Sequence, residues 1–190
     1  MIGKFGILCG ALLSLGGCMS GNLPPPASTG GTEHGSPETR FLLQNARAFA
    51  AQQDYTRAEQ YLNLAAQSGS PDSEVTPLLV DVCVQDQRYR AALQYAQDYL
   101  RRHPRAYRLR FVEATLLSAM GEVARAREEL EKVLSASPHH ADAHYSLAVL
   151  LRDDLGNHLE ADEHFRSYLK LQPRGAHAEE AGQSLLEAMP

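Results

Sequence analysis

Small apolar residues recur along this chain with a period of about 34 positions. Ala58, Ala92, Ala126 and Ala161 are separated by 34, 34 and 35 residues. A period of this length is typical of stacked helix–turn–helix units, in which two helices cross closely where the side chain is only a methyl group. The pattern therefore predicts an all-α protein of about four such units, an architecture that serves binding more often than catalysis.

Other positions repeat with the same period and divide each unit into two helices. The small position of the first helix is taken by Ala46, Val80, Ala114 and Ala148, and an apolar position of the second helix by Leu62, Ala96, Leu130 and Phe165. Units end at Pro104, Pro138 and Pro173, and Pro71 stands one place late in the first unit. Gly121 and Gly156 mark the turn between the two helices, where a left-handed residue is expected.

These features resemble the tetratricopeptide repeat over residues 39–173. The resemblance implies a right-handed superhelical solenoid in a folded domain of residues 38–190. The expected repeats span residues 39–72, 73–106, 107–140 and 141–175, followed by a capping helix over residues 176–188.

The sequence also departs from the family pattern. Leu42, Thr76, Arg110 and His144 replace a large aromatic residue, and Asn45 and Glu113 stand where Leu is usual. We expect these polar groups to be hydrated or hydrogen-bonded. Because a proline inside a helix costs about 3 kcal/mol, we expect Thr76 to cap and Pro77 to open a shortened helix.

The first 18 residues have the features of a bacterial secretion signal. A short basic start precedes the uncharged apolar residues 5–15, which are too few to span a bilayer. The closing Leu15-Gly16-Gly17-Cys18 resembles the lipobox of bacterial lipoproteins, which implies removal of residues 1–17 and lipid attachment at Cys18. In that family an Asp directly after the cysteine favours the inner membrane, so Met19 and Ser20 imply, by this resemblance, the outer membrane, facing the periplasm. The alternative is an ordinary secretion signal with a chance cysteine.

Residues 18–37 are rich in Gly, Pro, Ser and Thr and offer almost nothing to bury, which predicts a disordered tether after the lipidated cysteine. The chain is mildly acidic, with a formal charge of −5, so nucleic acid is not an expected partner. Once Cys9 leaves with the signal and Cys18 carries lipid, Cys83 is the remaining thiol. Its apolar neighbours predict a small buried side chain rather than a nucleophile.

The resemblance implies that the first helix of each unit lines a concave groove. The polar and aromatic positions expected there are Arg40, Arg47, Asp81, Gln85, Arg108, Phe111, Thr115, Tyr145 and Arg152, interspersed with Leu43, Ala50, Val84, Ser118, Asp142 and Val149. Such a mixture suits an extended peptide or a helix of a partner protein. Phe111 and Tyr145 are the expected anchors, which places the partner between the third and fourth units. The basic residues 101–110 are a rival binding surface, or only a helix end with cations.

No catalytic constellation, phosphate-binding loop or cofactor motif is recognisable. His139, His140 and His144 lack the carboxylate motif of a metal site, so no metal is expected. The architecture is similar to that of secretin pilotins of type IV pili and lipoproteins of tight-adherence pili. The expected function is an outer-membrane-anchored, non-enzymatic scaffold or assembly factor for a pilus or secretin. Alternatives are a scaffold for outer-membrane protein insertion or peptidoglycan enzymes, or an accessory subunit of a motility or hydrolase complex.

Overall fold

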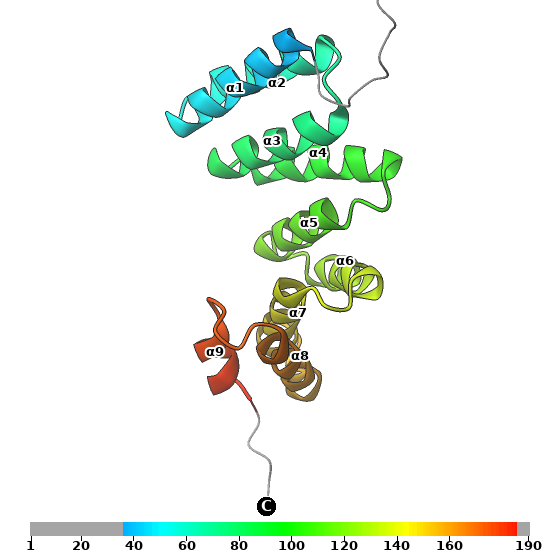
Figure 1. Cartoon of the computed structure of the whole chain (residues 1–190). Coiled ribbons are helices and arrows are strands. Elements are labelled where there is room, and N and C mark those ends of the chain that lie inside the picture. The colour runs from blue at the N-terminus through cyan, green and yellow to red at the C-terminus, as the bar shows by residue number, and fades with distance from the viewer. Residues whose placement is uncertain (1–35, 186–190) are drawn as a thin grey trace, which may run out of the picture. The chain divides into compact units, whose positions relative to one another are not determined.

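Helices in antiparallel pairs make up the part of the chain that the computed structural model describes, residues 36–185 (Figure 1). Nine helices and no strand lie in this range: α1 (Pro37–Ala51), α2 (Tyr55–Gln67), α3 (Asp72–Gln85), α4 (Tyr89–Arg102), α5 (Tyr107–Ala119), α6 (Val123–Ala136), α7 (Ala141–Asp153), α8 (His158–Leu171) and α9 (Ala178–Gln183). None of them is long and apolar enough to cross a membrane. The prediction of an all-α chain is confirmed over these residues.

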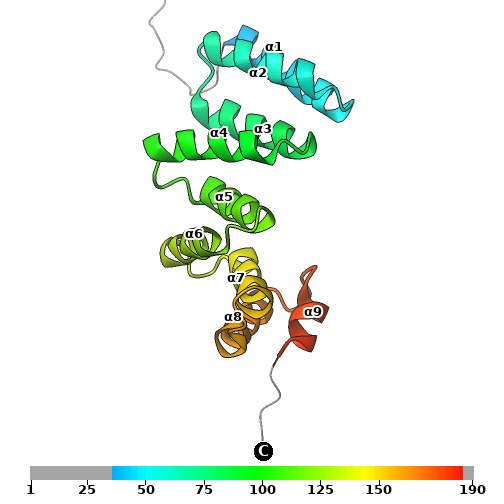
Figure 2. The same cartoon turned by 180° about the vertical axis from the view of Figure 1, so that it is seen from behind.

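Each helix packs against its neighbours along the chain, so the pairs α1/α2, α3/α4, α5/α6 and α7/α8 are stacked in sequence order (Figures 1 and 2). The first helices of successive pairs also touch, as α1 with α3 and α5 with α7. The four alanines of the 34-residue period are fully buried or nearly so. Their methyl groups lie where the second helix of each pair meets the core, as the spacing predicts.

Side-chain caps begin several of these helices. Ser36 Oγ accepts a hydrogen bond from the Thr39 amide at the start of α1, and Asp54 does the same for the Arg57 amide at the start of α2. His140 and Asn157 cap α7 and α8. These bonds satisfy amides that have no partner within a helix, and they set where each helix starts.

The turn inside each repeat uses one residue in the left-handed conformation. Gly121 and Gly156 take this role in the third and fourth repeats, with φ of 76° and 63°, which confirms the role predicted for them. Gln53 and Gln87 adopt the same conformation in the first two repeats, with φ of 62° and 58°. A residue with a Cβ atom pays a steric cost there that glycine avoids.

The buried apolar side chains form two clusters. One lies in the first two repeats around Leu43, Leu62 and Leu79, and the other extends from Val80 in α3 to the C-terminal helix. Cys83 is completely buried in the second cluster, and burial raises the pKa of its thiol. The prediction of a small buried cysteine is confirmed.

The prediction that Thr76 caps a shortened helix is wrong. Helix α3 begins at Asp72 and runs through Pro77, and Val75 and Thr76 are both buried in its second turn. The ring of Pro77 removes one helical hydrogen bond near the start of the helix. Packing of the turn that precedes it against the first cluster, to which Val75 belongs, stabilises the helix despite this loss.

The C-terminal helix is shorter than the predicted capping helix of residues 176–188. Helix α9 ends at Gln183, and residues 186–190 lie outside the described range. Gly182 disfavours a longer helix, and Ala181 is the only residue of α9 that is fully buried. Burial of one side chain does little to stabilise a six-residue helix, so α9 also depends on polar contacts with α7.

Hydrogen bonds satisfy several of the polar residues that stand at apolar positions of the family pattern. Glu113 is buried and accepts a hydrogen bond from Gln97 Nε2 at 3.0 Å, and Arg110 pairs with Glu129. The His144 ring contacts the ring of His164, with 2.9 Å between their Nδ1 atoms. The expectation of hydrogen-bonded polar groups is confirmed for Glu113, Arg110 and His144.

Candidate binding site on the face of the first helices

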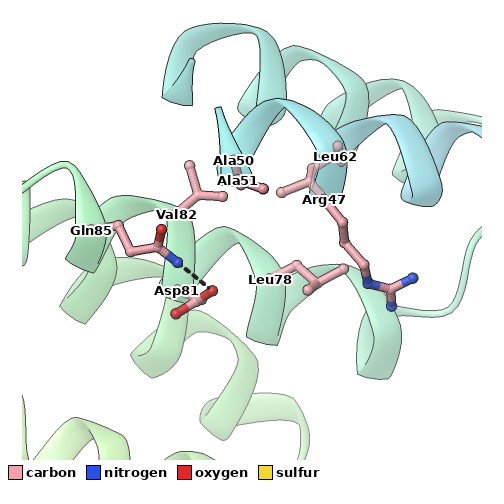
Figure 3. A pocket seen from close by; sticks show the side chains of 9 residues that line it. Arg47, Ala50, Ala51, Leu62, Leu78, Asp81, Val82 and Gln85 are labelled. Atoms are coloured by element: carbon pink, nitrogen blue, oxygen red, sulfur yellow. Dashed lines mark hydrogen bonds between the residues drawn. The ribbon is translucent and has the colours of Figure 1, made fainter. Parts of the chain in front are cut away.

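The structure brings three of the predicted polar groove residues together at one hollow between α1 and α3. Arg47 comes from α1, and Asp81 and Gln85 come from α3 (Figure 3). The hollow has a volume of about 320 Å³. The groove expected along the first helices includes these three positions.

Apolar side chains line the rest of this hollow, which we call the α1/α3 hollow. They are Ala46, Ala50, Ala51, Leu62, Leu78 and Val82. Ala46 of α1 and Leu62 of α2 are both buried and both line the hollow, and the small Ala46 lets the two helices pack closely. The side chains of Ala50 and Ala51 at the end of α1 are single methyl groups, so they do not fill the hollow.

The polar groups of the α1/α3 hollow lie on opposite sides of it in Figure 3. Gln85 Nε2 donates a hydrogen bond to Asp81 Oδ2 at 2.7 Å, one helical turn apart on α3. Arg47 is exposed and has no ion pair with any described residue. The hollow therefore offers an apolar surface flanked by one free guanidinium and by a carboxylate–amide pair with remaining acceptor and donor capacity.

The groove residues predicted on α5 do not join this hollow. Phe111 is half-buried and packs against the His140 ring, with 4.8 Å between ring centroids. Thr115 Oγ1 donates to the carbonyl of Val112 in its own helix. Arg108 is exposed and lines a different hollow, and Arg40 is exposed in the first turn of α1 away from both.

The face of α7 is covered by the chain's own C-terminal segment. Tyr145 stacks on His177 with 4.0 Å between centroids, and its hydroxyl donates to Glu180 at 2.5 Å. Arg152 contacts Glu180 and donates to Ser184 Oγ. Burial and the Glu180 hydrogen bond raise the pKa of Tyr145 to about 12. The open site expected between the third and fourth units is thus occupied by α9 at Tyr145 and Arg152.

Part of the lining lies outside the positions predicted for the groove. Leu62 packs between helices, as its apolar position in the repeat predicts, and it also contributes to the hollow. Leu78 lies in a helix that runs continuously through Pro77, whereas the sequence predicts a helix that starts there. A continuous helical register from Asp72 onwards is the sequence signal that would place Leu78 on this face.

Two of the three histidines singled out in the sequence, His140 and His144, have structural contacts. His140 Nδ1 accepts from the Ala143 amide at 3.2 Å, and His144 contacts the Pro138 carbonyl as well as His164. In the described range no group of three or more His, Cys, Asp or Glu side chains is arranged to hold a metal ion.

Comparison with known proteins identifies the repeat. The family model described as tetratricopeptide repeat matches residues 111–176, which include most of α5 and all of α6, α7 and α8. No curated protein matches the sequence.

Solved structures share the fold at low sequence identity. YrrB, described as a tetratricopeptide repeat protein with an unusual peptide-binding site, has a TM-score of 0.64 at 21% identity, with 76% of this chain and 74% of that chain covered. A tetratricopeptide repeat protein of Parabacteroides merdae gives 0.69 at 20% identity, covering 78% of this chain and 59% of that one. MamA of Desulfovibrio magneticus gives 0.66 at 16% identity, covering 78% and 92%. Residues 111–176 are therefore identified as tetratricopeptide repeats, and the described helices have the fold of a tetratricopeptide-repeat solenoid.

Proposed function

We propose that this protein is a non-enzymatic scaffold that binds a peptide segment of a partner protein in the α1/α3 hollow. The observation that carries the proposal is the hollow itself, which combines an apolar lining with Arg47, Asp81 and Gln85 at its margin. An extended segment requires a pocket for an apolar side chain and polar groups that pair with its backbone or charges. The peptide-binding site named for YrrB supports this choice, because that protein shares the fold.

We further propose that the protein is located in the bacterial cell envelope. The lipobox resemblance at Cys18, the signal of residues 1–17 and the tether of residues 18–37 support a lipoprotein of the outer membrane that faces the periplasm. All of these lie outside the described residues, apart from the last two of the tether. A membrane-tethered scaffold suits an assembly factor for a pilus or secretin. The alternatives are a general envelope scaffold for outer-membrane protein insertion or peptidoglycan enzymes, and an accessory subunit of a motility or hydrolase complex.

Site-specific photo-crosslinking in cells tests the peptide-binding proposal. We expect a photoreactive amino acid at Gln85 to form a discrete adduct with one partner, identified by mass spectrometry. The same group at Glu128, which is exposed on α6, serves as the control and gives no such adduct. Filling the hollow with Ala50→Trp is expected to abolish the Gln85 adduct while helicity is retained. Equal adducts from Gln85 and Glu128, or an adduct that survives the filled hollow, would exclude this site.

A further inference from the structure

The basic residues 101–110 contain five arginines and no acid, and the structure divides these arginines into two groups. Three are neutralised by acids of this chain: Arg101 pairs with Asp98 at 2.7 Å, Arg102 with Asp72, and Arg110 with Glu129. The side chains of Arg105 and Arg108 are exposed and have no hydrogen bond or ion pair with any described residue. The positive charge available to a partner is thus concentrated on these two side chains.

Arg105 and Arg108 line the same hollow, of about 670 Å³. It lies where the end of α4 connects to the start of α5, and it shares no residue with the α1/α3 hollow. Its other lining residues are Pro77, Tyr99, Ala106, Tyr107, Leu109, Val112 and Ser137. We call this the α4/α5 hollow.

Among residues 36–185, no carboxylate lines the α4/α5 hollow, although the chain as a whole is acidic. The first turn of α5 also contains no acidic residue, so the positive end of its dipole adds to the local potential. The lining joins aromatic and aliphatic surface from Tyr99, Tyr107 and Val112 to two free guanidinium groups. Guanidinium groups bind carboxylates with two parallel hydrogen bonds, which makes arginine well suited to recognise acidic side chains.

We propose that the α4/α5 hollow is a second docking site, for an acidic peptide segment of a partner protein. In this complex an apolar or aromatic side chain enters the hollow, and flanking Asp or Glu carboxylates pair with Arg105 and Arg108. The site is separate from the one proposed above, so either one can fail alone. An anionic membrane surface fits less well, because such surfaces are recognised by clusters of about four to eight free cations and only two are free here.

A titration of the 15N-labelled full chain with a synthetic probe tests this site. The probe is a capped peptide, Asp-Glu-Phe-Asp-Glu, and its uncharged counterpart carries Asn and Gln in place of the acids. We expect the acidic probe to shift backbone amides at Tyr107, Leu109 and Val112, with affinity that falls as salt rises. The uncharged counterpart is expected to bind at least about tenfold more weakly, because it loses the charge-assisted pairs.

Two double variants distinguish a specific binding site from nonspecific electrostatic attraction. Arg105→Gln with Arg108→Gln is expected to weaken probe binding about tenfold or more. Arg101→Gln with Arg102→Gln removes the same charge from the same segment but alters arginines that are already paired, so binding is expected to stay within about twofold. Circular dichroism of each variant confirms that helicity is unchanged.

Several results would overturn the proposal. Equal losses in the two double variants would show nonspecific attraction, and equal binding of the uncharged counterpart would show that carboxylates are not recognised. Absence of shifts around the α4/α5 hollow at millimolar probe would exclude the site. Binding to phosphatidylglycerol vesicles that requires Arg105 and Arg108, with no response to the peptide, would assign this surface to a membrane instead.

Discussion

Gln53, Gln87, Gly121 and Gly156 occupy the same turn in successive repeats and share the left-handed conformation. Glycine adopts this conformation without steric cost, whereas a residue with a Cβ atom pays about 1–2 kcal/mol. The first two repeats therefore carry a local strain that the last two avoid. The helices on both sides of these turns form despite the strain because their apolar side chains are buried.

Gln53→Gly is expected to stabilise the protein by about 0.5–1 kcal/mol, since the relief of strain exceeds the added entropy of the unfolded chain. The neighbouring Gln52 has φ of −88° and is also exposed, so Gln52→Gly is the matched control. It is expected to destabilise by about 0.5–1 kcal/mol. Urea unfolding of the two variants measures both changes. If both variants change the free energy of unfolding in the same direction, the left-handed conformation of Gln53 does not carry the strain inferred here.

Burial of His164 beside His144 is expected to make the stability of the fold sensitive to pH. Burial, and then the neighbouring His144, lower the pKa of His164 below its usual value of 6.5, while Glu131, Glu160 and Glu163 oppose the shift. A base whose pKa is lowered in the folded state contributes stability that is present above its unfolded pKa. This stability is lost as the pH falls through the folded-state pKa.

We expect the melting temperature of the wild type to fall more between pH 7.5 and 5.5 than that of His164→Gln. A change of 1 kcal/mol shifts the melting temperature by about 2–4 °C in a domain of this size, so calorimetry resolves the difference. His158→Gln, an exposed histidine on the same helix, is the control and is expected to follow the wild type. If the wild type and His164→Gln curves stay parallel, the histidine pair has no role in the pH response.

At the scale of elements, α9 is the least anchored helix of the described range. It has six residues and one buried side chain, and the contacts of Tyr145 and Arg152 with Glu180 hold it against α7. The hydrogen bond from Tyr145 lowers the pKa of Glu180, which keeps this carboxylate charged. Helix α9 covers aromatic and arginine side chains that the repeat pattern assigns to partner binding.

Glu180→Ala is expected to speed amide hydrogen exchange in α9 by about three- to tenfold, because a partly exposed charge-assisted hydrogen bond contributes about 1 kcal/mol. The matched control is Glu179→Ala, since Glu179 is exposed on the same helix and has no contact with Tyr145. Exchange in α7 is expected to change little in either variant. Unchanged exchange in α9 after Glu180→Ala would show that stacking of Tyr145 on His177 suffices to hold the helix.

At the scale of the whole molecule, membrane attachment is proposed to depend on one residue outside the described helices. Cys18→Ala is expected to move most of the protein from the outer-membrane fraction to the soluble periplasm, or to leave an unprocessed precursor, because several acyl chains are needed for stable anchoring. Cys83→Ala alters the buried thiol instead and serves as the control that keeps its location. Wild-type fractionation of Cys18→Ala would refute lipid anchoring.

The period of the small residues determined the fold from the sequence alone. Alanines 34 or 35 residues apart specify helix crossings that a larger side chain would push apart, and the glycine turns and unit-ending prolines agree with the same register. The buried position of Cys83 followed from its apolar neighbours in the same way. These features are local or periodic, so they are readable without coordinates.

The candidate sites depended on contacts between segments distant in sequence. The resemblance placed Arg47, Asp81 and Gln85 on one face, but only the packing of α1 on α3 makes a hollow between them. Tyr145 bonds to Glu180 of α9, and Arg102 pairs with Asp72. Each of these contacts joins residues about 30 or more positions apart. Charge and burial at a surface are set by such long-range neighbours, whereas a helix and its register are set within a few turns.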